Sequence, residues 1–309
     1  MSAENNEKDT QEQELWERIS TTNGTERAEV LDELSHIAYK RDDYTECLQL
    51  VETSIDIYFK QGGLDVYLKE ITHLYQGKAH CLQNLKRLAE AAETFEQIAS
   101  LKYIDQDDSG QLSALRAAGR TWYEVEEWRR CLDNHLAATA IIDPDATPFS
   151  MGIDQLNIGM ALARLKSHKD ASESYLKARL LFKEAKNPEH VNWCDNYLAI
   201  EYIKLDNGAE AKFHAQHYFN YSKVAEDLTM EGYARYRLGV AYFLCQQYED
   251  AEKHLVRSLE LLTLDEYKDW EDIVGANEEL AKVLTALGRE EEAQERLERI
   301  KTIQETIAA

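Results

Sequence analysis

Small side chains recur along this chain at a nearly constant interval of about 40, and this period limits the folds open to it. The first series is Ser35, Ala79, Gly119, Gly159, Ala199, Gly239 and Ala281. Twelve residues after each comes a second small residue, and that series is Cys47, Ala91, Cys131, Ala171, Ala211, Ala251 and Ala293. Small residues at matched positions let two helices cross closely. The pattern predicts helical hairpins that stack on one another, because a single hairpin cannot bury its apolar face alone.

The repeat is clearest in the segment from 236 to 262, where apolar and small residues alternate at helical spacing. Its defining positions are Leu238, Gly239, Tyr242, Tyr248, Ala251, Leu255 and Ser258. These residues resemble the tetratricopeptide signature, which has Leu-Gly and an aromatic residue in the first helix and Ala followed by a bulky residue in the second. The resemblance covers about Glu26 to Ile303 and is weakest in the first two repeats, where Ser35 and Cys47 stand and the interval stretches to 44.

The resemblance implies an all-α fold, a right-handed superhelix of about seven helical hairpins with a C-terminal capping helix. A period of about 40 exceeds the ~34 of the commonest form and implies longer helices or longer connections. Arrays with such long repeats are similar to Rap-type peptide receptors, kinesin light chains and polarity adaptors, all of which bind peptides or proteins. We expect a disordered acidic tail over 1–13, one solenoid domain over 14–303 and a short C-terminal end over 304–309.

Composition agrees with an all-α fold. The chain has only 3 prolines and 13 glycines, and it has no run of about 18 apolar residues of the kind that spans a membrane. Its first residues lack the order of a secretory signal. Its 5 cysteines are scattered without a C-x-x-C pair, which predicts reduced, buried thiols and a cytoplasmic location.

The charge excludes two classes of partner. A net charge of −23 disfavours both nucleic acid and anionic membranes, which are bound through basic surfaces. Residues 110–240 carry 18 acidic and 16 basic side chains, so the centre of the chain is nearly neutral. No phosphate-binding loop, dinucleotide fingerprint, metalloprotease motif or nucleophile elbow is present, and the carboxylates are interpreted as lying on solvated helix faces. The sequence therefore predicts a protein without enzymatic activity and without a cofactor.

The first helix of each tetratricopeptide hairpin lines the inner face of the array, and this resemblance selects the candidate peptide-binding residues. They are aromatic, amide-bearing or basic, and they are Arg116, Arg120, Tyr123, Asn157, Met160, Arg164, Trp193, Asn196, Tyr197, Lys204, Tyr233, Tyr236 and Arg237. Amides suit the backbone of an extended peptide, and arginine pairs with carboxylates. We expect a peptide or protein partner with an acidic residue or a free carboxylate. Asn157 and Asn196 are the first candidates, as two matched inner asparagines without a helix-propensity explanation.

Histidines form a second pattern. The second repeat presents His73, Gln76, His80 and Asn84 on one face, and His36 occupies the equivalent site of the first repeat. Zinc binding and pH sensing are alternatives to a merely polar inner surface. We predict no metal, on the interpretation that the face lacks a cysteine or carboxylate at a suitable spacing. His214 and His217 are interpreted as surface histidines.

Two other functional classes stay open. In the first, the protein self-associates through its outer faces or ends, and its groove is packed or filled by its own acidic tail. Leu297, Ile300, Ile303 and Ile307 form either a capping surface or a homodimer seam. In the second, it is a regulatory receptor whose superhelix changes pitch when a small signalling peptide binds.

Overall fold

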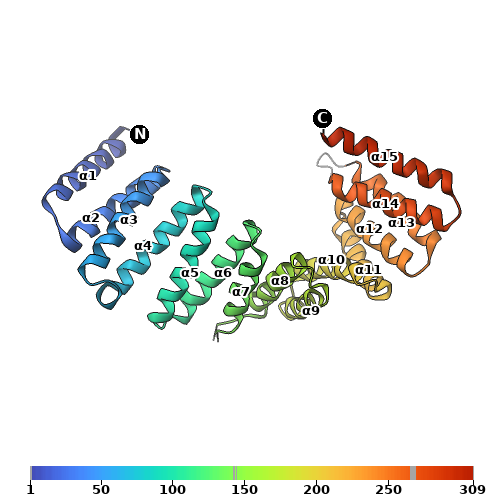
Figure 1. Ribbon diagram of the computed structural model, residues 1–309, viewed down its shortest axis with the longest axis horizontal. Coiled ribbons are helices and arrows are strands. Elements are labelled where there is room, and N and C mark those ends of the chain that lie inside the picture. Colours follow the sequence, from blue (N-terminus) through green and yellow to red (C-terminus); the bar gives the residue numbers. More distant parts are fainter. Residues whose placement is uncertain (1, 142, 144, 265–268, 309) are drawn as a thin grey trace. The chain divides into compact units, whose positions relative to one another are not determined.

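The computed structural model describes residues 2–141, 143, 145–264 and 269–308, with the side chains of 12–307 among them. These residues form fifteen helices and no strand. None of the described helices is both long and apolar enough to cross a membrane. The chain divides into two compact units, Met1–Asp145 and Ala146–Ala309, and each unit is a row of consecutive helices (Figure 1).

Unit 1 contains a leading helix and three hairpins. Its helices are α1 (Ser2–Thr21), α2 (Gly24–Lys40), α3 (Tyr44–Gln61), α4 (Leu64–Asn84), α5 (Leu88–Ile104), α6 (Asp108–Glu124) and α7 (Trp128–Thr139). Each helix packs on the next along the chain, both within the hairpins (α2 with α3, α4 with α5, α6 with α7) and between them, where the contact of α5 with α6 is extensive.

Unit 2 contains four hairpins. Its helices are α8 (Pro148–Arg164), α9 (His168–Glu184), α10 (Pro188–Lys204), α11 (Gly208–Ala225), α12 (Leu228–Leu244), α13 (Tyr248–Leu262), α14 (Trp270–Ala286) and α15 (Glu290–Ala308). The first helices also touch from one hairpin to the next, since α10 packs on α12 and α12 packs on α14. The described helices thus give the seven hairpins that the repeat predicted.

Longer helices explain the long period. Helices of 17 residues alternate with turns of three residues from α8 to α10, and α5 and α6 have the same length. The stretched interval between Ser35 and Ala79 has a local cause: α4 has 21 residues, whereas α2 and α6 have 17. The extra turn stands at the start of α4, before its crossing residue Ala79.

The two small-residue series mark the helix crossings. All fourteen residues are buried. A Cβ atom added to Gly159 would lie 2.6 Å from Tyr175 Cε1, and one added to Gly239 would lie 2.5 Å from Leu255 Cγ. These distances are shorter than van der Waals contact, so side chains of the facing helix already fill the space that a larger residue would need.

The turns inside the hairpins share one geometry, although they have few glycines. Each has a single residue in the left-handed region: Asp42, Lys86, Glu126, Lys166, Asp206, Gln246 and Gly288. The next residue donates its backbone N–H to a carbonyl five residues earlier, as from Ser167 to Leu162 at 2.9 Å. This is the Schellman motif, which satisfies carbonyls at a helix end. Six of the seven turns use a residue with a Cβ atom where glycine is favoured.

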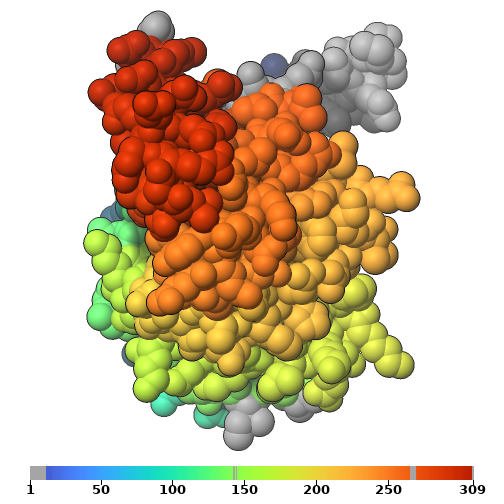
Figure 2. Space-filling model, turned by 90° about the vertical axis from the view of Figure 1, so that its right-hand side faces the viewer, coloured from blue at the N-terminus to red at the C-terminus, as the bar shows by residue number. Residues whose placement is uncertain are grey.

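The described residues near both ends of the chain are helical. The segment expected to be a disordered tail is part of α1, and the side chains of residues 2–11 lie outside those described, so the division at residue 13 stays a prediction. The capping role falls to α15, which is both the second helix of the seventh hairpin and the outermost helix at that end (Figure 2). Ile300 and Ile303 of α15 are buried, whereas Leu297 and Ile307 are exposed.

Candidate functional site

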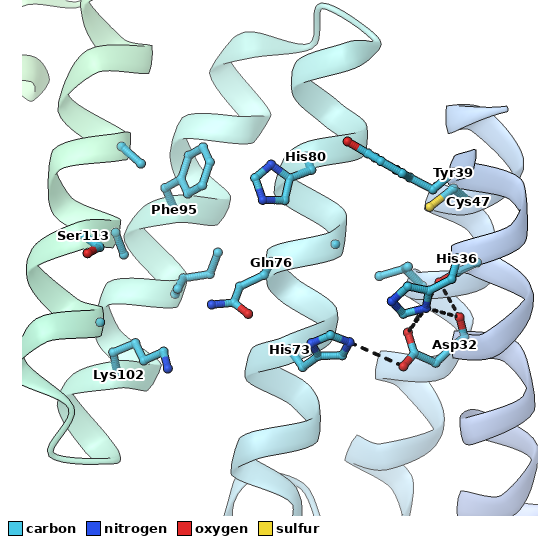
Figure 3. A pocket seen from close by; sticks show the side chains of 17 residues that line it. Asp32, His36, Tyr39, Cys47, His73, Gln76, His80, Phe95, Lys102 and Ser113 are labelled. Atoms are coloured by element: carbon cyan, nitrogen blue, oxygen red, sulfur yellow. Dashed lines mark hydrogen bonds and ion pairs between the residues drawn. The ribbon is translucent and has the colours of Figure 1, made fainter. Parts of the chain in front are cut away.

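A hollow lies on the first-helix face of unit 1, and we call it the unit 1 pocket (Figure 3). Its volume is about 670 Å³. Side chains from α2, α4 and α6 line it, together with residues of α3 and α5 behind them. The first helices of three successive hairpins therefore face the same space, as the tetratricopeptide resemblance implied.

The rim of the unit 1 pocket is polar, and its residues stand at matched positions of successive repeats. Asp32 and Gln76 each lie three residues before the crossing residue of their hairpin, and His36 and His80 each lie one residue after it. Gln76, His36 and His80 are exposed. Residues three and four apart share a helix face, so these offsets select one face of each first helix. The histidines that the sequence pattern places on one face therefore line this pocket.

The floor of the unit 1 pocket is apolar. Val51, Phe95 and Ile98 come from the second helices and are 8% exposed or less. Cys47 also lies here, and its thiol is hydrogen-bonded to that of Cys81, with the two sulfur atoms 2.8 Å apart. The pKa of the Cys47 thiol is raised by this hydrogen bond and by burial, so Cys47 is an inert part of the floor.

Small residues behind the rim give the pocket its depth. Gly77 and Ala117 each lie two residues before the crossing residue, and both line the pocket. In unit 2 the same offset carries Tyr197 and Arg237, which are large. A Cβ atom added to Gly77 would meet only Val51 Cγ2 at 3.7 Å, so the space there is open to a larger side chain.

Asp32 joins the histidines at the rim, although the histidine pattern of the sequence does not include it. His36 Nδ1 lies 3.7 Å from one carboxylate oxygen of Asp32, and His73 Nε2 lies 3.6 Å from the other. The two imidazole rings are stacked, with centroids 5.7 Å apart and planes at 14°. The signal is present in the sequence, because Asp32 precedes His36 by four residues and so shares its helix face.

The predicted peptide-binding residues of unit 1 lie on α6. Relative to the crossing residue of their hairpin, Arg116 and Arg120 stand at the same positions as Gln76 and His80. The unit 1 pocket is lined by other residues of α6. Arg116 is partly buried. Arg120 is exposed and forms no hydrogen bond or ion pair with any described residue. Tyr123 packs edge-on against Trp128, with ring centroids 4.9 Å apart.

In unit 2, several predicted residues interact within the fold. Arg237 Nη1 donates to Asp272 of α14 at 3.1 Å, and Lys204 lies 3.4 Å from Glu201. Tyr197 stacks on Tyr175 with centroids 5.1 Å apart. These side chains contact other residues of their own chain.

The remaining residues of unit 2 that were predicted to bind a peptide differ in exposure. Trp193 is 40% exposed and lies against His190. Burial raises the pKa of Tyr236 to about 12, and its hydroxyl lies against Gly275 of α14. Met160 and Tyr233 are partly buried, and Arg164 is exposed.

The two asparagines do not occupy matched sites, and this corrects the sequence interpretation. Asn157 lies two residues before Gly159, whereas Asn196 lies three residues before Ala199. Both are partly buried, and the Oδ1 atom of Asn196 is buried without a hydrogen-bond partner among the described residues.

Unit 2 also contains buried carboxylates, where the sequence suggested only solvated ones. Asp195 is 2% exposed and accepts from Arg179 Nε at 2.8 Å and from His214 Nδ1 at 2.6 Å. His214 is therefore buried rather than a surface histidine. Glu201 and Glu231 are likewise buried and bonded to cationic side chains or histidine. These paired carboxylates have a structural role, because a buried charge is tolerated only with its partners.

Comparison with known proteins identifies one repeat directly. Residues 72–104, which include most of α4 and all of α5, match the family described as tetratricopeptide repeat. No curated protein matches the sequence.

Several solved structures share the fold at low sequence identity. A STAND signal-transduction ATPase with a tetratricopeptide repeat sensor, PH0952 from Pyrococcus horikoshii, has a TM-score of 0.63 and 17% identity over 90% of this chain and 42% of its own. The apo form of RapI has a TM-score of 0.59 and 12% identity over 90% of this chain and 77% of its own. The apo quorum sensor NprR from B. thuringiensis has a TM-score of 0.54 and 13% identity over 96% and 81%.

The chain thus spans less than half of the Pyrococcus ATPase and most of RapI and NprR. At these identities the likeness shows a shared fold and carries no residue assignments. The match identifies a tetratricopeptide repeat at residues 72–104, and the helical hairpins of both units, together with these neighbours, show that the chain has the fold of a tetratricopeptide solenoid with long repeats.

Proposed function

We propose that this protein is a non-enzymatic scaffold that binds an extended segment of a partner in the unit 1 pocket. The observation that carries the proposal is the pocket itself, an apolar floor with a polar rim on the first-helix face. Binding sites of this kind are mostly apolar and use a few placed polar groups for orientation. The tetratricopeptide fold supports protein binding in general. That the partner binds in the unit 1 pocket is our proposal.

The pocket chemistry suits a peptide in extended form. Such a peptide exposes N–H and C=O groups that need hydrogen-bond partners. Gln76 offers both a donor and an acceptor, and His80 offers one of each in its neutral form. An apolar side chain of the ligand fits over Phe95 and Ile98, where it is buried from water.

A preference for an acidic residue or a free carboxylate rests on Arg120. It is exposed on α6 and has no partner among the described residues, so its guanidinium is available for a bidentate pair. Arg237 does not support this preference, since its guanidinium already forms an ion pair with Asp272.

The proposal is tested by filling the pocket without disturbing the fold. Gly77→Leu places a side chain in the hollow, and the local geometry leaves room for its Cβ atom. Gln97→Leu on the exposed face of α5 is the matched control. Peptides are first selected from a random phage-displayed library on the wild-type protein, and their affinities for all three proteins are then measured by fluorescence anisotropy.

We expect the selected peptides to bind Gly77→Leu at least about tenfold more weakly and the control unchanged, a loss of about 1.4 kcal/mol. Arg120→Ala should weaken only peptides that carry an acidic residue or depend on a free C-terminus. Equal affinity for the wild type and Gly77→Leu would show that the pocket is not the binding site. Light scattering over a range of concentrations tests the self-association alternative, which requires a mass that rises with concentration.

A further inference from the structure

Asp32, His36 and His73 converge at one end of the unit 1 pocket, and this cluster has its own chemistry (Figure 3). Asp32 and His36 stand four residues apart on α2, and His73 faces them from α4. One ligand atom from each residue lies within 4.8 Å of the others. A carboxylate and two imidazoles are a common ligand set for zinc.

The distances in the cluster are close to those of ligands around a shared ion. His73 Nε2 lies 3.6 Å from a carboxylate oxygen of Asp32, which is longer than a hydrogen bond. Ligand atoms about 2.1 Å from a tetrahedral zinc ion lie about 3.4 Å from each other. His73 is exposed, so its ring is free to rotate to this separation.

Neighbouring groups already orient the ligands. His36 Nδ1 lies 2.8 Å from the main-chain carbonyl oxygen of Asp32, and a carbonyl cannot donate, so Nδ1 carries the proton. The Nε2 atom of His36 is then the one whose lone pair can bind a metal. Ser35 Oγ lies 3.4 Å from the Asp32 carboxylate and donates mainly to the Asp32 carbonyl at 2.7 Å. Hydrogen bonds of this type fix the tautomer and direction of metal ligands.

The rim is also accessible and electrostatically suitable. Because His36 and His73 are exposed, an ion reaches the cluster from solvent without a change of fold. The net charge of −23 concentrates cations near the protein. Among the described residues, the ion-pair partners of Asp32 are the two histidines, and no lysine or arginine neutralises it there.

We propose that Asp32, His36 and His73 bind a divalent transition-metal ion, with Zn²⁺ as the expected ion. Two nitrogen ligands and one oxygen favour Zn²⁺, Cu²⁺ or Ni²⁺ over Mg²⁺ and Ca²⁺, which prefer oxygen ligands only. Three protein ligands leave a fourth position for water or another donor. This site departs from the sequence prediction of no metal, because that prediction overlooks the carboxylate four residues before His36.

The test uses the intact, untagged protein and the metal alone. Zn²⁺ binding is measured by isothermal titration calorimetry under reducing conditions, and Co²⁺ is used as a spectroscopic substitute whose visible absorption reports tetrahedral coordination. Asp32→Asn, His36→Gln and His73→Gln each remove one ligand. His80→Gln is the matched control, because His80 lies on the same rim outside the cluster.

We expect each ligand variant to bind Zn²⁺ at least about tenfold more weakly, and His80→Gln to bind as the wild type does. Replacing Cys47 and Cys81 by alanine should leave the affinity unchanged, which separates this site from the buried thiol pair. Excess Mg²⁺ should not compete. If the wild type binds no more tightly than the three ligand variants, or if the loss of the thiols abolishes binding, the assignment is wrong. Because no peptide is present, this result is independent of the peptide-binding proposal.

Discussion

Alanine in place of glycine should have opposite effects at two positions of unit 1, Gly77 and Gly119. Both glycines lie inside helices, where the change to alanine stabilises by about 0.5–1 kcal/mol through backbone entropy. At Gly77 the new Cβ atom meets only Val51 Cγ2 at 3.7 Å, an ordinary contact. Gly77→Ala should therefore raise the free energy of unfolding by about 0.5–1 kcal/mol.

At Gly119 the same atom would lie 2.6 Å from Nε2 and 2.7 Å from Cδ2 of His135, a ring that is 1% exposed. Overpacking of this kind costs about 1–3 kcal/mol. The helix-propensity gain is common to both variants, so Gly119→Ala should be less stable than Gly77→Ala by about 1–3 kcal/mol.

Urea unfolding followed by circular dichroism measures the difference, and native-state hydrogen exchange of α6 and α7 localises it, because repeat arrays unfold in parts. His135→Ala supplies a further control, since the fifth repeat pairs Ala199 with Ala215 at the equivalent crossing. In the double variant Gly119→Ala with His135→Ala, the new Cβ atom no longer meets the imidazole ring. The destabilisation caused by alanine at position 119 should therefore disappear. Equal stability of the two glycine variants would refute the argument that the crossing distance dictates the small residue.

Three further predictions concern unit 2. Lys166→Gly should stabilise by about 0.5–1 kcal/mol in urea unfolding, because Lys166 has φ of 61° at a helix end and glycine adopts that conformation without strain. Asp195→Ala should destabilise by about 3–5 kcal/mol, since it leaves Arg179 and His214 without their buried partner; an effect below about 1 kcal/mol would contradict this. Burial raises the pKa of Glu231, but hydrogen bonds from two cationic side chains outweigh it and hold the pKa below the ordinary 4.5. Its contribution to stability is therefore present above that value and lost as the pH falls through the lowered pKa. Glu231→Gln should lose less stability than the wild type in urea unfolding as the pH is lowered from about 6 to below the lowered pKa.

The amino-acid sequence alone determined the repeat and the positions of the helix crossings. Gly159 and Gly239 could be recognised because close crossings admit only small residues, and this constraint recurs at a fixed interval. The histidine face at His73 and His80 followed from the same periodicity. Periodicity predicts which face of a helix a residue occupies, since that depends only on spacing along the chain.

Which side chains meet across helices was decided by the tertiary structure. The sequence predicts that Arg237 faces a ligand, yet its offset turns it toward Asp272, 35 residues away on α14. It also predicts a surface position for His214, which is buried on Asp195. Likewise, Asp32 and His73 meet only because their helices bring them to one pocket of unit 1. Such pairs depend on the rotation and spacing of packed helices, which are set by the volumes of all the residues between them and leave no periodic trace in the sequence.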